Sequence, residues 1–223
     1  MTVALLSDVH ANLVALEAVL GALPPVDGVW VMGDTVGYGP DPQDTLALLR
    51  ERGALIVAGN HDRAVATGVG LELFNPVARS AAELHRSWLS AEDKDLLGEL
   101  PLTLEPAAGY EICHGSPRDP LWEYVFDGRI ATAAMTATGA TYCCVGHTHV
   151  AAKFLTGDGK FMVNPGSVGQ PRDGDPRASY ALLDVAAASV EFHRVEYDIG
   201  ETQRRMRARG LPEPLAERLR FGV

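Results

Sequence analysis

Five of the seven histidines in this 223-residue chain fall in short motifs that also hold an aspartate, an asparagine or a glycine. Together with one histidine-free Gly-Asp pair, the motifs are Asp8-Val9-His10, Gly33-Asp34, Gly59-Asn60-His61-Asp62, Cys113-His114-Gly115 and Gly146-His147-Thr148-His149. Imidazole and carboxylate groups suit Mn, Fe and Zn, and an asparagine oxygen is a further neutral donor. Seven candidate donors exceed the four ligands of a structural zinc site. The number instead favours two metals that share one bridging carboxylate, as in a two-metal hydrolase.

Two of the motifs indicate how carboxylates would be used. Asp34 has two oxygens and can therefore bridge two cations. Asp8 and His10 alternate around one residue, so an extended chain end would point both side chains the same way.

The third motif adds a candidate acid. His61 adjoins the amide donor Asn60, so we expect its ring to point away from the metal that Asn60 faces. We expect Asp62 to hold the His61 imidazole by a hydrogen bond and to favour its protonated form. Such an imidazole suits a general acid, which contributes about 10²–10⁴ in rate. The alternative is a capped helix start with Asp62 in its first turn.

A short apolar run precedes each of the motifs, as expected of a buried strand. The runs lie at residues 3–6, 29–32, 55–57, 110–113 and 142–145. The first three alternate with helical patterns, which predicts parallel strands joined by crossover helices. Ligands of open α/β sheets gather outside the carboxyl ends of the strands. Loops at one sheet edge can therefore bring donors together that are far apart in sequence.

The remaining chain predicts further elements of the same α/β fold. We expect helices at 13–20 and 46–49, from 76 to 89, from 91 onward, and in a tail from 200 that is broken near 210–212. Further strands are expected at 151–155, 161–163, 180–183 and 190–197, with Gly157-Asp158-Gly159 as a hairpin signal. We see no linker, so residues 1–223 are predicted to form a single domain, an α/β sandwich of three or four layers.

Composition narrows the partners. A net charge of −10 argues against a standing duplex nucleic acid partner, because phosphate backbones are held by basic patches. Three cysteines without repeating spacing are expected to be small buried side chains rather than a disulfide framework. The N-terminus does not resemble a signal peptide, and no apolar run approaches the roughly 20 residues of a membrane span. We therefore expect a cytoplasmic protein without a membrane partner.

The five motifs, in this order, resemble the signature of the calcineurin-like metallophosphoesterase superfamily. That signature is Asp-x-His, Gly-Asp, Gly-Asn-His-Asp/Glu, a single His and Gly-His-x-His, and here it spans Asp8 to His149. The resemblance implies a metallophosphoesterase β-sandwich flanked by helices, with a dinuclear site at its edge. This fold agrees with the predicted placement of the motifs after strands.

The resemblance also implies roles. The first metal would be held by Asp8, His10 and His149, the second by Asn60, His114 and His147, with Asp34 bridging both. His61 would be the acid, with Asp62 as its partner. A metal-bound hydroxide would attack phosphorus in line while two divalent ions, Mn first and Fe, Zn or Ni as alternatives, stabilise the attacking and leaving oxygens.

Two departures from related sequences narrow the substrate. Ser/Thr protein phosphatases of this superfamily carry arginines where this chain has Tyr38 and Ala58. The Gly37-Tyr38-Gly39-Pro40 form and the later Asn164–Gly169 segment resemble the small prokaryotic branch, whose members typically cleave phosphodiesters. A small phosphate-ester substrate of this kind is expected. The alternatives are a diadenosine polyphosphate hydrolase, a phosphomonoesterase, or a non-catalytic scaffold.

Three further residues are candidates for substrate binding. Asn12 could donate to a phosphate oxygen or cap the first helix. Arg172 carries a planar cation suited to phosphate, with a surface salt bridge as the alternative. Tyr38 could line the pocket or pack in the core. Oligomeric state is open, with a homodimer as the most common outcome for soluble proteins.

Overall fold

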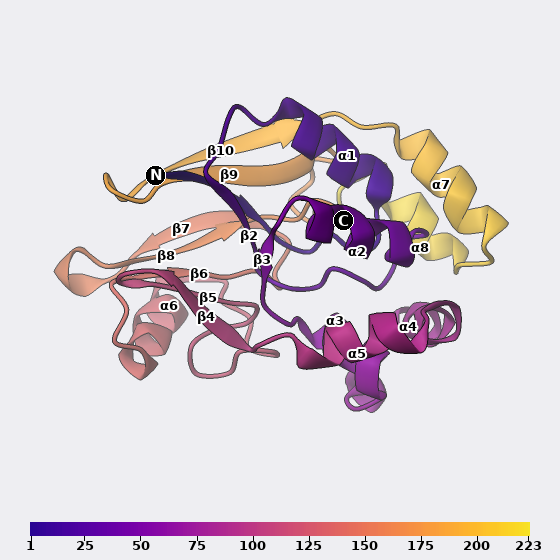
Figure 1. The fold of residues 1–223 in the computed structure, drawn as a ribbon, viewed down its shortest axis with the longest axis horizontal. Coiled ribbons are helices and arrows are strands. Elements are labelled where there is room, and N and C mark those ends of the chain that lie inside the picture. Colours follow the sequence, from indigo (N-terminus) through magenta and orange to yellow (C-terminus); the bar gives the residue numbers. More distant parts are fainter.

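The computed structural model describes residues 1–157 and 159–223 in full and residue 158 by its backbone alone. Two five-stranded sheets form the centre of the molecule, with strand orders β10-β9-β1-β2-β3 and β4-β5-β6-β8-β7. Figure 1 shows the two sheets one above the other, with helices on their outer sides. The predicted α/β β-sandwich flanked by helices is confirmed.

The first sheet is built around the N-terminal strand. It comprises β1 (Thr2–Leu6), β2 (Gly28–Val31), β3 (Leu55–Ile56), β9 (Ala178–Asp184) and β10 (Ser189–Val195). β1, β2 and β3 pair in parallel, as their alternation with helices predicts, whereas β9 and β10 are antiparallel.

The second sheet contains the strands of the middle of the chain. It comprises β4 (Thr103–Ala107), β5 (Tyr110–Cys113), β6 (Tyr142–Cys144), β7 (Ala151–Leu155) and β8 (Phe161–Pro165). β5, β6 and β8 are parallel. β7 and β8 form the predicted antiparallel hairpin, joined by the 3₁₀ turn η3 (Gly157–Gly159).

Helices cover the outer faces and one end of the sandwich. They are α1 (Leu13–Ala22), α2 (Pro42–Glu51), α3 (Asn60–Thr67), α4 (Pro76–Trp88), α5 (Ala91–Glu99), α6 (Gly128–Ala134), α7 (Ile199–Ala208) and α8 (Glu213–Arg218), with 3₁₀ turns η1 (Leu71–Leu73) and η2 (Met135–Ala137). α1 lies on the outside of the first sheet and α6 on the outside of the second, which gives four layers (Figure 1).

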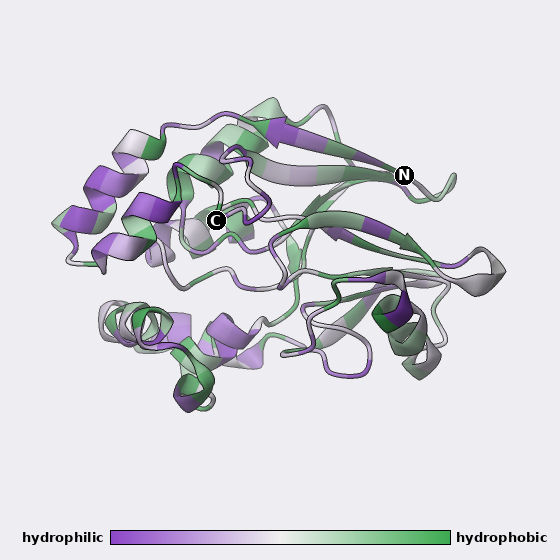
Figure 2. Cartoon of the chain, turned by 180° about the vertical axis from the view of Figure 1, so that it is seen from behind, coloured by the Kyte–Doolittle hydropathy of each residue, from purple (hydrophilic) through white to green (hydrophobic). Residues whose placement is uncertain are grey.

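The apolar run of β1 is buried on both faces, because successive side chains of a strand point to opposite sides. Val3 and Leu5 pack in the core between the sheets, whereas Ala4 and Leu6 pack in the core beneath α1. Figure 2 shows hydrophobic residues along the inner strands and hydrophilic ones on the tail helices. The three cysteines are buried, as predicted. None of the helices in the described residues is long and apolar enough to cross a bilayer.

Three elements go beyond the sequence prediction. The strand β4 and the helix α6 were not predicted from the residue pattern, and α3 begins within the third motif, at Asn60. Asp62 is the third residue of α3, and its carboxylate accepts a hydrogen bond from Gly59 N at 3.0 Å. The helix-start alternative for this motif is therefore the observed one.

Candidate metal centre

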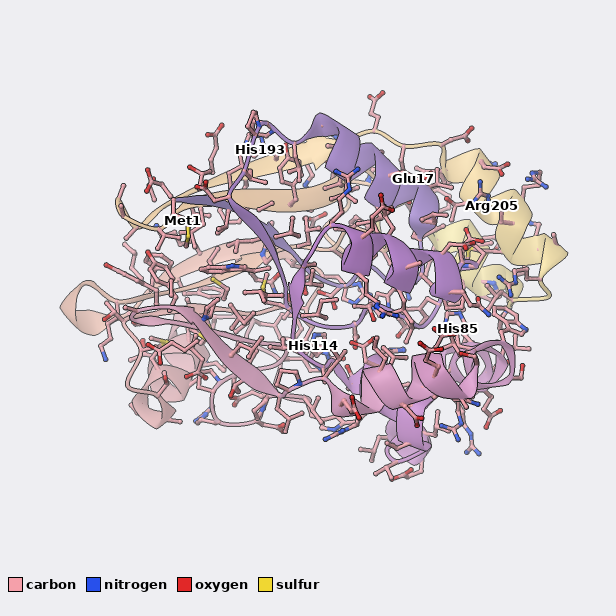
Figure 3. The ribbon with its side chains drawn as sticks, in the orientation of Figure 1. Met1, Glu17, His85, His114, His193 and Arg205 are labelled. Atoms are coloured by element: carbon pink, nitrogen blue, oxygen red, sulfur yellow. The ribbon has the colours of Figure 1, made fainter. Side chains whose placement is uncertain are left out.

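The five motifs meet at the carboxyl ends of β1, β2, β3, β5 and β6, as the strand-end argument predicts. Figure 3 shows the labelled His114 in the interior, whereas His193 lies on the outer strand β10. The extended chain end expected for Asp8 and His10 is wrong, because both residues have left-handed backbones, with φ of 52° and 48°. Asp34, His147 and His149 are also left-handed. Such strain, about 1–3 kcal/mol per residue, persists where the surrounding structure enforces it and is concentrated at functional sites.

The first cluster of donors comes from the loops after β1 and β6. His10 Nε2 lies 3.1 Å from His149 Nε2, and Asp8 Oδ1 lies 3.3 Å from His149 Nε2 and 3.9 Å from His10 Nε2. All three side chains are buried. Their donor atoms all lie within 4.8 Å of one another, close enough to hold one metal ion.

The second cluster comes from the loops after β5 and β6 and from the start of α3. His114 Nε2 lies 3.1 Å from Asn60 Oδ1 and 3.0 Å from His147 Nδ1. Asp34, His114 and His147 likewise have donor atoms within 4.8 Å of one another. This arrangement could hold a second ion, with Asn60 supplying a neutral oxygen.

Asp34 lies between the two clusters. Its Oδ2 is 3.6 Å from His10 Nε2 and 3.3 Å from His114 Nε2. Its Oδ1 is fixed by the backbone N–H of His61, which donates to it at 2.8 Å. One carboxylate oxygen is therefore free to face both clusters at once.

The hydrogen bonds behind three of the histidines fix which ring nitrogen faces the centre. Nδ1 of His10, His114 and His149 faces the carbonyl oxygens of Val36, Met32 and Gln170 at 3.0, 2.8 and 2.5 Å. A carbonyl only accepts, so each Nδ1 carries a proton and each Nε2 faces the centre, where a neutral ring offers a lone pair to a metal.

In the first cluster, hydrogen-bond acceptors face one another without a donor between them. His10 Nε2 and His149 Nε2 face each other at 3.1 Å, and Asp8 Oδ1 beside them finds no hydrogen-bond partner among the described side chains. Buried acceptors without a donor are costly. Bound cations would satisfy all of them, so the donor set fits divalent metals.

The pKa values of the carboxylates and histidines indicate which groups of the centre carry charge. Burial raises the pKa of Asp8 to about 7, although the charge on His114 opposes the shift. Burial also acts to lower the pKa of His114, but the charges of Asp34 and Asp8 and the hydrogen bonds of the ring together raise that pKa to about 9. Burial lowers the pKa of His147 to about 3. Burial acts to raise the pKa of Asp34, but the positive charge of His114 keeps it well below its usual value. His147 is neutral, and Asp8 is the carboxylate left short of compensating charge.

The close approach of Asp34 to the start of α3 explains the glycine at position 59. A Cβ at Gly59 would lie 2.0 Å from Asp34 Oδ1 and 2.3 Å from Asp34 N. The strand end that carries Asp34 and the start of α3 can therefore approach only when residue 59 has no side chain.

The expected pairing of His61 with Asp62 is wrong. Oδ1 of Asp62 accepts hydrogen bonds from Thr35 N, Thr35 Oγ1 and Val36 N at 2.9, 2.7 and 3.1 Å, and its Oδ2 accepts from Gly59 N. Asp62 therefore fixes two loops and does not hold the imidazole.

The ring of His61 is instead held by aromatic neighbours. The centroids of the Tyr38 and Phe74 rings lie 4.5 and 4.4 Å from its own, and the His10 ring lies at 4.9 Å. Burial lowers the pKa of His61 to about 4, although the carboxylate of Asp34 opposes this. The expectation that Asp62 favours the protonated form of His61 is therefore also wrong. Nδ1 of His61 lacks a hydrogen-bond partner in the part of the chain described.

The prediction that Asn12 binds substrate is corrected, because both of its polar atoms are engaged elsewhere. Asn12 Oδ1 caps α1 by accepting from Ala15 N at 3.2 Å and also accepts from Thr202 Oγ1 at 3.1 Å. Asn12 Nδ2 donates to the Gly169 carbonyl oxygen at 2.9 Å. Of its two predicted roles, the structure shows the helix cap.

Tyr38 and Arg172 both line a cleft that opens from the centre. The cleft has a volume of about 100 Å³. It is lined by Asp34, Tyr38, Asn60, His61, Leu73, Phe74, Asn75, Ala78, Trp122, Tyr124, His147, His149 and Arg172. Gln170 Oε1 accepts from Arg172 Nη2 at 2.8 Å and orients the guanidinium. This volume is below the range of about 300–1,000 Å³ for enclosed small-molecule sites, so a substrate would extend beyond the cleft onto its rim.

Several supporting residues were missed by sequence reasoning. Ser7 Oγ donates to Asp8 Oδ2 at 2.7 Å, and Ser167 Oγ donates to the Asp8 carbonyl oxygen at 2.7 Å. Asn164 Nδ2 donates to the Gly146 carbonyl oxygen at 2.5 Å. Ser7 adjoins the first motif, which is a weak signal, whereas Asn164 and Ser167 lie more than 150 residues from Asp8 and become neighbours only through the fold.

With this geometry established, comparison with known proteins defines the class. The chain belongs to the calcineurin-like phosphoesterase superfamily, because the model of that superfamily's domain matches residues 1–188. Members of the superfamily are metal-dependent hydrolases of phosphoric esters, in agreement with the His and Asp groups described above.

Individual relatives agree with this assignment. The crystal structure of a metallophosphoesterase from Sphaerobacter thermophilus is 44% identical, covers 100% of this chain and 99% of that chain, and superposes with a TM-score of 0.89. An uncharacterised protein of Methanocaldococcus jannaschii is 34% identical over 99% of this chain and 98% of its own length. A symmetrical bis(5′-nucleosyl)-tetraphosphatase of Pectobacterium carotovorum is 40% identical over 67 residues, which are 28% of this chain and 24% of that protein.

Proposed function

We propose that this protein is a two-metal phosphodiesterase that hydrolyses a small nucleotide-like or organic phosphodiester. Manganese is the first candidate metal, with iron, zinc and nickel as alternatives. The observation that carries the proposal is the position of Asp34 Oδ2, which faces His10 Nε2 at 3.6 Å and His114 Nε2 at 3.3 Å. The proposed ligands are Asp8, His10 and His149 for one ion and Asn60, His114 and His147 for the other, with Asp34 between them.

When bound, two divalent ions lower the pKa of water enough to supply a nucleophile near neutral pH and stabilise the charge of an in-line displacement. The residues of the cleft supply position. Arg172 binds an unesterified phosphate oxygen through its planar guanidinium. His61, which lies in the cleft between Tyr38 and Phe74, delivers a proton to the leaving oxygen once the negative charge of the bound phosphate has raised its pKa. The buried walls limit the access of water to the reacting groups.

The charge of the cleft favours a diester over a monoester. Arg172 is the one lysine or arginine among the described residues that line it. A diester carries one negative charge on its phosphate, whereas a monoester carries up to two near neutral pH. The positions at which related protein phosphatases place arginines hold Tyr38 and Ala58 here. A single side-chain cation matches the lower charge.

A second candidate activity is hydrolysis of a dinucleoside polyphosphate. It is favoured by the 67-residue stretch that is 40% identical to a symmetrical bis(5′-nucleosyl)-tetraphosphatase. The short coverage of that match places it behind the phosphodiesterase proposal.

Chelation followed by a substrate panel tests the proposal. The purified protein should lose hydrolysis of bis-p-nitrophenyl phosphate when chelated and recover it with Mn²⁺. Asp34→Asn should lower this activity by about 100-fold or more, since even residues that only support metal ligands are worth about 10–100-fold. Asp44→Asn, an exposed aspartate on α2, is the matched control and should retain activity. A preference above about tenfold for p-nitrophenyl phosphate or diadenosine tetraphosphate would overturn the diester assignment.

A further inference from the structure

Three aromatic side chains on the cleft are used by neither the metal ligands nor the proposed acid. They are Phe74, Trp122 and Tyr124, which we call the aromatic wall, and all three line the cleft that opens from the centre. Tyr124 is 43% exposed, and the other two are half-buried. Large aromatic side chains contribute most when their faces are covered. One exposed and two half-buried rings gathered in the cleft of the candidate metal centre therefore point to a ligand.

The aromatic wall touches the centre on both sides. The ring of Phe74 lies 4.4 Å from that of His61, and the ring of Tyr124 stacks on that of His147 at 3.9 Å with an interplanar angle of 23°. Trp122 meets Phe74 edge to face at 5.8 Å. A group that lies on this wall is therefore attached to a phosphate at the centre by only a short connection.

Hydrogen bonds order the segment that carries Trp122 and Tyr124. It follows β5, and it is closed by backbone hydrogen bonds from Gly115 N to the Pro120 carbonyl oxygen at 2.7 Å and from Ser116 N to the Asp119 carbonyl oxygen at 3.0 Å. The carboxylate of Asp119 accepts from Trp122 N at 3.1 Å. These contacts order the backbone up to Trp122, and the ring of Tyr124 stacks on the rings of His147 and Phe126. Side chains that are ordered before a substrate arrives lower the entropic cost of binding.

A glycine on the opposite side makes room for the indole. Gly70 has a left-handed backbone with φ of +90°, and a Cβ there would lie 3.1 Å from Trp122 Cζ2. Residues before α4 and residues after β5, which are far apart in sequence, thus meet to form one wall.

We propose that the aromatic wall binds the planar base of a nucleoside phosphate ester whose phosphate lies at the metal centre beside Arg172. The inference rests on the proposed function and names its substrate class. Aromatic side chains stack on every base because each base has a π-face. Arg172 supplies the cation for the attached phosphate in the same cleft. Base stacking here distinguishes nucleotide substrates from phosphodiesters of small alcohols.

Binding of two probes to the manganese-loaded protein tests this inference without measuring turnover. AMP and ribose 5-phosphate carry the same phosphate and pentose, and only AMP carries a base. Calorimetry should give a Kd for AMP at least about tenfold lower than that for ribose 5-phosphate, in line with one base stacked on an aromatic ring. Trp122→Ala and Tyr124→Ala should each raise the Kd for AMP by about fivefold or more and leave that for ribose 5-phosphate within about twofold.

Two further variants keep the outcome interpretable. Trp122→Leu retains apolar bulk and should lose AMP selectivity as Trp122→Ala does, even where the alanine variant folds poorly. Phe192→Ala, on β10 and 40% exposed, is the matched control and should bind both probes like the wild type. Equal affinity of the wild type for the two probes, or selectivity retained in Trp122→Leu, would overturn the inference.

The same measurements separate this inference from the proposed function. Hydrolysis of bis-p-nitrophenyl phosphate together with equal affinity for AMP and ribose 5-phosphate would leave the phosphodiesterase standing and remove the base site. Selective AMP binding without hydrolysis of any diester would support the base site and remove the phosphodiesterase proposal.

Discussion

At the scale of single residues, the centre is a set of buried acceptors whose direction is fixed from behind. Main-chain carbonyl oxygens accept hydrogen bonds from Nδ1 of His10, His114 and His149. Ser7 Oγ donates a hydrogen bond to one carboxylate oxygen of Asp8. Each of these contacts leaves one lone pair to face the centre. Such supporting contacts orient metal ligands and raise their basicity.

The separate roles of His61 and Asp62 can be measured in one experiment. His61→Ala should lower kcat by about 10²–10⁴ while the metal content stays unchanged, because the ring acts on the leaving oxygen. Asp62→Ala should instead lower the free energy of unfolding by about 1–3 kcal/mol, since it leaves several buried N–H and O–H donors without their acceptor. Steady-state kinetics and urea unfolding of both variants give the comparison. Unchanged turnover in His61→Ala would remove its proposed role.

Residue type and order were enough to predict that the seven donors meet, because each follows an apolar strand. The partners of Asp62 and Asn12 could not be predicted in this way. Asp62 finds its donors in the loop after β2, and Asn12 finds Thr202 on α7, 190 positions away. A short polar side chain forms hydrogen bonds with the groups that the tertiary structure places beside it. The adjacent residues in the sequence do not identify those groups.

At the scale of elements, the loop after β2 shapes the cleft and is held from α4. His85 on α4 accepts from Gly37 N at 3.0 Å through Nδ1 and donates to the Gly39 carbonyl oxygen at 2.8 Å through Nε2. Tyr38, between those two glycines, lies in the cleft. Figure 3 shows His85 on the inner side of α4. His85 thus fixes Tyr38, which in turn contacts the ring of His61.

The pH dependence of stability should report this contact. Burial lowers the pKa of His85 to about 3, although a hydrogen bond to the Gly39 carbonyl oxygen opposes the shift. The unfolded chain, with a histidine pKa near 6.5, binds the proton first, so stability is lost as pH falls through that range. Between pH 7 and pH 5 the unfolding free energy should fall by about 2 kcal/mol more in the wild type than in His85→Gln. Urea unfolding with chelator present measures both, and parallel pH profiles would contradict the assignment.

Most elements were predictable because apolar runs and helix caps are local signals. Ser90, for example, accepts from Asp93 N at 3.0 Å and begins α5 as expected. β4 was not predicted, because its sequence Thr-Leu-Glu-Pro-Ala contains a proline and becomes a strand only at the sheet edge beside β5. α6 is short, with seven residues, and its periodicity is correspondingly weak.

At the scale of the whole molecule, the C-terminal tail closes the back of the site. The superfamily model ends at residue 188, before β10, α7 and α8. The tail nevertheless packs Met206 against the same cluster as Tyr38, and Arg205 pairs with Asp41 at 3.1 Å. Figure 1 shows α7 and α8 beside the ends of the strands. The tail therefore supports the loop that carries Tyr38.

A substitution of a buried residue in the tail should destabilise the loop that carries Tyr38. Met206→Ala should lower the unfolding free energy by about 2–5 kcal/mol, the usual cost of a cavity at a fully buried position. It should also speed hydrogen exchange at the amides of Gly37 and Gly39, because the loop loses its backing. Arg204→Ala, exposed on the same helix, is the control. Exchange at these amides that matches the wild type would separate the tail from the cleft.

The overall architecture was predictable for two different reasons. The parallel strands of the first sheet followed from the alternation of strands and helices. Four strands of the second sheet were predicted from the sequence pattern, whereas the β-sandwich was implied by resemblance to the superfamily. The packing of the tail against the cleft depends on contacts between residues more than 160 positions apart, such as Arg209 with the Pro40 carbonyl oxygen. One domain over residues 1–223, a cytoplasmic location and a homodimer stay predictions.

Anomalous scattering from a crystal grown with saturating manganese tests the central claim most directly. The account predicts two manganese peaks, one beside Asp8, His10 and His149 and one beside Asn60, His114 and His147, with Asp34 Oδ2 between them. A single peak, or none, would contradict it.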